Sequence, residues 1–113
     1  MNIQIFGTKK SFDTKKAQRY FKERRVKFQF IDLKEKGMSK GELESVARAV
    51  GGIDAVIDPK AKDADTVALV QYLAADQKFE KMLDNQQILR EPIVRNGRQA
   101  TVGYEPDVWK GWE

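Results

Sequence analysis

Short apolar runs and a helical stripe alternate at the start of this chain and predict a strand–helix–strand unit. Residues 3–6 form an apolar run that ends at Gly7, which is typical of a buried strand. Apolar residues within 12–25 fall at helical spacing, and residues 26–31 then alternate apolar and polar, which is the two-residue period of a strand. Two strands joined by a helix in this way are expected to be parallel, with a right-handed crossover.

The middle of the chain carries helical patterns only. Ser39 and Glu42 form a capping-box pattern in front of an apolar stripe, which predicts a helix over 39–50. Two further helical stretches fall within about 60–84. We expect this segment to be a helical insertion between the opening unit and the strands that follow.

The last third of the chain predicts a β-hairpin over 93–102. Asn96 and Gly97 stand between two short apolar runs, and both residue types tolerate the positive φ that a tight hairpin turn requires. The whole pattern predicts one α/β domain over 1–113, with a mixed sheet of about four strands flanked by helices. Its aromatic core is expected to contain Phe6, Phe28 and Phe30.

Two residue types that carry much of enzyme chemistry are missing from the 113 residues. The chain has no cysteine, which excludes disulfides and thiol chemistry, and no histidine, the commonest general base and transition-metal ligand. We therefore expect no metal and no cofactor. No apolar run is long enough to cross a membrane and the first residues resemble no signal peptide, so a cytoplasmic protein without membrane contact is expected.

The charge is concentrated in the first third of the chain. Residues 1–40 hold twelve Lys or Arg against four acidic residues, whereas residues 41–113 hold nine against thirteen. Such a basic segment either attracts an acidic protein or a small anion, or is simply a solvated helix face. It lacks interleaved aromatic residues and any nucleic-acid-binding motif, so nucleic acid is not the expected partner.

Two motifs bracket the chain. The first is Gly7-Thr8-x-x-Ser11-x-x-Thr14-Lys15-Lys16-Ala17, and the second is Leu89-Arg90-Glu91-Pro92-Ile93-Val94, followed by Asn96-Gly97-Arg98 and Val102-Gly103-Tyr104. Together they resemble the active-site loop and the late strand segment of the arsenate reductase (ArsC) and Spx family. The resemblance implies a thioredoxin-like fold with a cis-proline at Pro92, and its reductase members depend on a catalytic cysteine.

The chain departs from that family at the residues that perform the reaction. The family's nucleophilic cysteine falls on Ser11, and the second cysteine of Spx-type members falls on Thr14. The arginine that precedes the proline in the reductases falls on Glu91, although Arg90 stands one position earlier, as in the regulators. A serine hydroxyl supplies neither an abundant nucleophilic anion nor a disulfide, so we expect no catalytic residue here.

Nine residues are the binding candidates that follow from the loop and from the resemblance. They are Thr8, Lys9, Lys10, Ser11, Lys15, Lys16, Arg90, Glu91 and Pro92. The loop at the carboxyl end of the first strand is expected to place the lysines and Ser11 at one edge of the sheet, where the unpaired N–H groups of the first helix favour an anion. The resemblance implies that Pro92 and Arg90 lie on the same side. Ser11 is alternatively a plain helix N-cap, and the lysines then only keep the helix in solution.

Three functions remain open from these residues. The first is a non-catalytic protein-interaction or regulatory module, since the Spx-type regulators that resemble this chain contact the transcription machinery. The second is a reductase-like domain that still binds a small anion or glutathione. The third is an engineered form of an active reductase, because serine for cysteine is also a substitution made to trap complexes.

Overall fold

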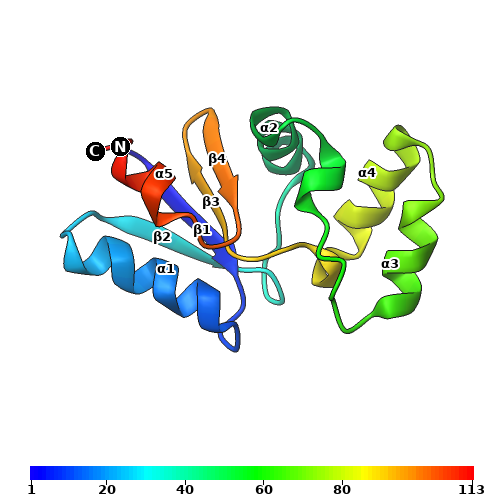
Figure 1. Ribbon diagram of the computed structural model, residues 1–113, viewed down its shortest axis with the longest axis horizontal. Helices are drawn as coiled ribbons and strands as arrows, with labels where there is room; N and C mark the ends of the chain where they lie inside the picture. Colours follow the sequence, from blue (N-terminus) through cyan, green and yellow to red (C-terminus); the bar gives the residue numbers. More distant parts are fainter.

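The computed structural model describes all residues 1–113 and opens with the predicted parallel unit. Strand β1 (Ile3–Gly7) is followed by helix α1 (Phe12–Glu23) and strand β2 (Phe28–Asp32). The two strands pair in parallel from Ile3↔Phe28 to Gly7↔Asp32, so their carboxyl ends lie at the same edge of the sheet (Figure 1). That edge carries both the loop before α1 and the loop after β2.

The predicted hairpin completes the sheet. Strands β3 (Ile93–Asn96) and β4 (Gln99–Val102) are joined by a tight turn at Gly97, whose φ of 62° suits glycine. Because Asn96 pairs with Gln99, the two central turn residues are Gly97 and Arg98, and the expectation of Asn96 in the turn at positive φ is wrong. Strand β3 also pairs antiparallel with β1, which gives a mixed sheet in the order β2-β1-β3-β4. The α/β class and the mixed four-stranded sheet predicted from the sequence are confirmed.

Helices cover both faces of this sheet. One face packs α1 and the short helix α5 (Pro106–Lys110) around buried Trp109, whose indole N–H donates to the Thr101 hydroxyl at 2.7 Å. The other face packs α2 (Lys40–Val50) and the remaining helices around buried Phe6. The β1 side chains alternate between the two clusters, as a strand covered on both faces requires.

Local signals set the boundaries of α2 correctly. The Ser39 side chain accepts from the Glu42 N–H, while the Glu42 carboxylate accepts from the Ser39 N–H, so the predicted capping box is present. The helix ends at Gly51, which is left-handed at φ 92°.

The helical segment between the two β units lies at the far end of the molecule from β2 and α1 (Figure 1). It holds α3 (Ala64–Gln71) and α4 (Ala75–Asp84), with the 3-10 turns η1 (Ile53–Val56) before them and η2 (Gln86–Ile88) after them. The Gln86 amide ties this segment to the loop after β2. Its oxygen accepts from the Met38 N–H at 2.7 Å, and its nitrogen donates to the Met38 carbonyl at 2.9 Å.

One expectation about the core is wrong in part. Phe6 is fully buried, but Phe28 and Phe30 are only half-buried and pack at the margin of the cluster around Trp109. The reason is the position of β2 at the edge of the sheet, where one side of the strand has no neighbour.

Candidate functional site

Ser11, which the resemblance places at the family's nucleophile position, is the N-cap of α1. Its hydroxyl oxygen accepts from the Thr14 N–H at 3.2 Å, and its carbonyl accepts from the Lys15 N–H at 3.1 Å. Asp13 lies in the first turn and does not cap the helix. The Ser11 side chain is therefore used to begin the helix, and a capping residue of this kind stabilises a helix by about 1 kcal/mol.

The side chain that occupies the loop is Glu91. Its carboxylate accepts from the Thr8 backbone N–H at 2.5 Å, from the Thr8 hydroxyl at 3.0 and 3.1 Å, and from the Thr14 hydroxyl at 2.8 Å. Three donors from the start of α1 and the loop before it thus converge on one carboxylate. Such hydrogen bonds to a charged acceptor are roughly twice as strong as neutral ones.

Strand pairing explains why Glu91 reaches this loop. Phe6 of β1 pairs with Ile93 of the antiparallel β3. Thr8 follows Phe6 by two residues and Glu91 precedes Ile93 by two, so the antiparallel pairing brings Thr8 and Glu91 together. Gly7 permits the close approach, because a Cβ there would stand 2.9 Å from Glu91 Oε1 and closer still to Thr14. The glycine of the first motif is required for packing at this point rather than for its backbone conformation.

The start of a helix attracts an anion, and here the chain supplies its own. The unpaired N–H groups and the macrodipole at an α-helix N-terminus favour negative charge. Glu91 stands where the resemblance places an oxyanion-binding arginine, and it is bonded by Thr14, at the second cysteine position of Spx-type members. The loop therefore holds a carboxylate where the family pattern would place an arginine.

The nine binding candidates do not all lie in one site. Four of them, Thr8, Lys10, Ser11 and Glu91, line one groove, and the other five do not. Lys9 and Lys15 are exposed, and Pro92 is buried and forms a cis peptide bond with Glu91, as the resemblance implied.

Two of the candidate cations pack against the chain itself. The Lys16 ammonium lies over the Tyr104 ring, 4.3 Å from its centroid. The Arg90 guanidinium lies against Gly103, where a Cβ would stand 3.1 Å from it. Both cations thus flank the segment after β4 rather than the groove.

The groove encloses about 890 Å³ between the loop before α1, the loop after β2 and the segments around α3 and η2. Four lysines that were not among the candidates line it together with Lys10, and they are Lys34, Lys36, Lys60 and Lys62. One signal could have found the first two: they directly follow β2, whose carboxyl end lies beside that of β1. The other two come from the loop before α3, whose position no local pattern predicts.

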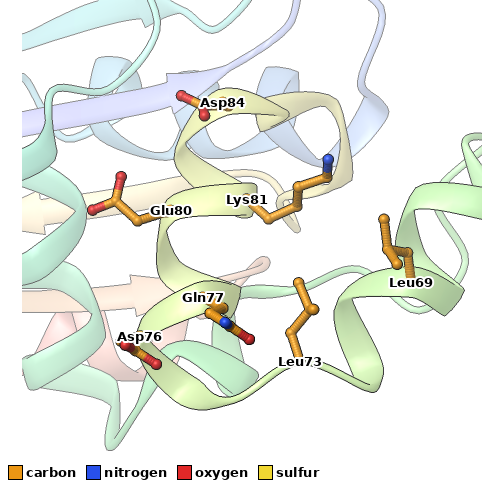
Figure 2. Close-up of a pocket in the computed structure, with 7 residues that line it drawn as sticks. All are labelled: Leu69, Leu73, Asp76, Gln77, Glu80, Lys81 and Asp84. Carbon is orange, nitrogen blue, oxygen red and sulfur yellow. The ribbon is translucent and has the colours of Figure 1, made fainter.

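A second hollow lies between α3 and α4 and is more open. Figure 2 shows Leu69 of α3 and Leu73 of the turn between α3 and α4 facing the space between the two helices, into which the Lys81 side chain also extends. Asp76, Glu80 and Asp84 stand along α4. In neither place do three carboxylates come together in a way that could hold a metal ion. No helix is long and apolar enough to cross a membrane.

Two titratable groups have clearly shifted pKa values. Burial raises the pKa of the Tyr20 phenol, whose side chain is 6% exposed. Hydrogen bonds from the Thr66 hydroxyl, the Gln87 amide and the Thr66 N–H lower the pKa of Asp63, a residue of the groove and the N-cap of α3. Asp63 therefore stays ionised at neutral pH and already has its own donors.

Comparison with solved structures defines the class of fold. A putative ArsC family related protein from Bacteroides fragilis superposes with a TM-score of 0.87 at 14% identity, covering 100% of this chain and 98% of that one. A putative arsenate reductase from Yersinia pestis gives 0.84 at 18% identity, covering 97% and 99%. An arsenate reductase from Vibrio cholerae gives 0.82 at 22% identity, covering 96% and 94%. The fold is that of arsenate reductase-like, thioredoxin-type proteins.

The sequence itself matches the ArsC family over residues 6–112, and the chain belongs to that family. No match is found among curated proteins. It is a member without cysteine.

Proposed function

We propose that this protein is a non-catalytic protein-interaction module of the ArsC family, in which Glu91 closes the former catalytic loop. The observation that carries the proposal is the bonding of the Glu91 carboxylate to the Thr8 N–H and to the hydroxyls of Thr8 and Thr14. These are donors that a bound oxyanion would otherwise use at the start of α1.

Arsenate reduction requires thiols that this chain lacks, which supports a non-catalytic role. The reductases need a thiolate that attacks arsenic and a second thiol that releases it, and this chain has no sulfur nucleophile. The Ser11 hydroxyl accepts a capping bond, and no histidine exists to act as its base. A serine oxygen also forms no disulfide, so the two-electron reduction has no route through this residue.

Electrostatics disfavours simple anion binding at the same loop. Two unit charges of like sign at about 4 Å repel by about 4 kcal/mol at an effective dielectric constant of 20. That energy corresponds to about three orders of magnitude in affinity. An arsenate or glutathione carboxylate beside Glu91 would meet this repulsion and would find Thr8 and Thr14 already bonded.

The same contacts bear on the engineered alternative. Replacing cysteine by serine at position 11 alone would not provide a carboxylate at position 91. The close fit of Gly7, Thr14 and Glu91 supports a loop adapted to its own glutamate. A regulatory role through protein contacts, as the resemblance to Spx-type regulators implies, requires no anion in this loop.

A paired assay tests the proposal. Purified protein is incubated with arsenate, glutathione and glutaredoxin, and NADPH oxidation by glutathione reductase is followed against a blank without the protein. We expect no rate above the blank, and we expect no thermal shift with phosphate, sulfate, arsenate or glutathione, since a ligand at 100 times its Kd would stabilise by about 2.7 kcal/mol. Turnover, or a saturable shift with any of these four, contradicts the proposal.

The double variant Ser11→Cys, Glu91→Arg is the companion experiment. It restores the two family residue types while leaving the rest of the loop unchanged. We expect its thiol to react with iodoacetamide faster than the thiol of Ser11→Cys alone, because Glu91 disfavours a neighbouring thiolate and arginine favours it. Equal rates would show that the charge at position 91 does not act on this loop.

A further inference from the structure

The groove beside the closed loop carries five lysines that form no ion pair within the chain. They are Lys10, Lys34, Lys36, Lys60 and Lys62, and all five are exposed. They come from three separate loops that the fold brings together, after β1, after β2 and before α3. An ammonium group without a carboxylate partner is available to a ligand from solution.

Backbone turns hold two of these loops in place. The Asp32 carboxylate accepts from the Lys34 N–H at 2.9 Å, and the Asp58 carboxylate accepts from the Lys60 N–H at 2.9 Å. In each turn an aspartate caps the backbone two residues ahead, as Asx turns do. The lysine side chains therefore extend from ordered turns, which reduces the entropy that a ligand must overcome to order them.

The carboxylates in the groove wall are largely committed to the chain itself. Asp58 caps a turn, Asp63 accepts from Thr66 and Gln87, and Glu91 accepts from the loop before α1. Asp84 stands at the end of α4 and makes no hydrogen bond. The hydrogen bonds of the other three come from neutral donors and leave each carboxylate its charge, so five ammonium groups face four carboxylates in the lining. The ammonium groups and Asp84 are the charged groups of the wall that have no partner within the chain.

Apolar side chains complete the wall. They are Leu33, Ala61, Leu83 and Leu89, and no aromatic residue is among the lining residues. Leu33, Ala61 and Leu83 are half-buried and give an apolar side chain of a ligand a surface to cover, whereas Leu89 is buried in the core. A single-stranded nucleic acid, by contrast, would find no ring on which to stack its bases.

We propose that the groove binds an acidic polypeptide segment in which carboxylates flank an apolar side chain. This inference rests on the proposed function and names the chemistry of its partner. Five ammonium groups spread over three loops exceed what one phosphate ion can contact, whereas an extended acidic segment reaches several of them. Lysine at a groove rim steers such a partner and speeds its association, most strongly at low salt.

Fluorescence anisotropy with two labelled peptides tests the inference. The probe is Glu-Glu-Leu-Glu-Glu, and its uncharged counterpart is Gln-Gln-Leu-Gln-Gln. The groove variant carries Lys34→Glu, Lys36→Glu and Lys60→Glu. Its matched control carries Lys22→Glu, Lys27→Glu and Lys110→Glu, exposed lysines outside the groove that make no ion pair, so both variants have the same net charge.

We expect the acidic peptide to bind the wild type in a salt-dependent manner and the groove variant to lose at least about tenfold in affinity, from several exposed charge pairs reversed together. The control should change by less than about threefold, since long-range charge is screened. Equal losses in both variants, no binding of the acidic peptide, or equal binding of the uncharged one overturns the inference. Stronger binding of oligo-dT through the same lysines also overturns it, in favour of nucleic acid.

These outcomes are separate from those of the proposed function. Arsenate turnover, or a small-anion thermal shift that persists in the variant carrying Lys34→Glu, Lys36→Glu and Lys60→Glu, would contradict the closed loop, whatever the peptide does. If the protein shows no turnover and no small-anion binding but also fails to bind the acidic peptide, the proposed function stands. Only the inference that the groove binds an acidic segment is then overturned.

Discussion

Replacing Glu91 by alanine removes the acceptor on which the loop before α1 converges. The substitution leaves the Thr8 N–H and the hydroxyls of Thr8 and Thr14 without their carboxylate. Thr14 is fully buried, whereas Thr8 is half-buried and can regain water. Since a hydrogen bond to a charged group contributes about 1.5–3 kcal/mol, we count the Thr14 bond in full and the Thr8 bonds in part. The expected loss is about 3 kcal/mol in the free energy of unfolding.

Urea denaturation followed by tryptophan fluorescence, from buried Trp109 and half-buried Trp112, measures this loss. With a slope near 2 kcal/mol per molar urea, a loss of about 3 kcal/mol lowers the midpoint by about 1.5 M. Glu91→Gln keeps the shape and one acceptor oxygen, so we expect it to cost only about 1 kcal/mol, the net value of an ordinary hydrogen bond. An unchanged midpoint for Glu91→Ala, or equal losses for both variants, would refute the reasoning.

A double-mutant cycle isolates the pair that matters most. Thr14→Val removes the hydroxyl with little change of shape, and Glu91→Ala removes its acceptor. If the bond at 2.8 Å acts as described, the two losses are not additive, and the coupling energy lies at about 1–2 kcal/mol. Additive losses would mean that each residue acts independently.

Three further predictions concern polar groups elsewhere. Thr101→Val should lower the free energy of unfolding by about 2 kcal/mol, because it leaves the buried Trp109 N–H unpaired. Thr101→Ser keeps the hydroxyl and should lose much less, so equal losses for the two variants would contradict this prediction. Tyr20→Phe should raise the free energy of unfolding by about 1 kcal/mol, since the buried hydroxyl has no partner in the protein; a lower value would count against it. The lowered pKa of Asp63 predicts a stabilisation that is present above pH 3.8 and is lost as the pH falls through the folded-state pKa. Urea midpoints of Asp63→Asn should therefore depend less on pH in acid, and an unchanged acid dependence would exclude this contribution.

Most of the fold could be predicted because its signals are local. Signals that depend only on residues a few positions apart set the capping box at Ser39, the left-handed Gly51 and the turn at Gly97. The parallel pairing of β1 and β2 followed from the helical pattern between the two strand patterns. The prediction that Phe28 lies in the core was wrong, because β2 is an edge strand. Whether a strand lies at a sheet edge depends on the order of all four strands, which no local pattern contains.

The site was predicted less completely for the same physical reason. Ser11 as an N-cap is local and is confirmed, and Glu91 was expected to bring negative charge to the loop. The sequence could not show that Glu91 is itself bonded by Thr8 and Thr14, since that contact spans most of the chain. The groove lysines could not be predicted as one set because their three loops meet only after folding, and Lys60 is far in sequence from the motif at Ser11.

The measurement that tests the central claim most directly is the amide resonance of Thr8 in an arsenate titration of ¹⁵N-labelled protein. A charge-assisted bond to Glu91 predicts a Thr8 N–H shifted strongly downfield, because such bonds are short. The account predicts that millimolar arsenate leaves this resonance in place in the wild type and that Glu91→Ala moves it upfield. A saturable movement of the wild-type Thr8 resonance with arsenate would show that the loop still admits an oxyanion, and would contradict the account.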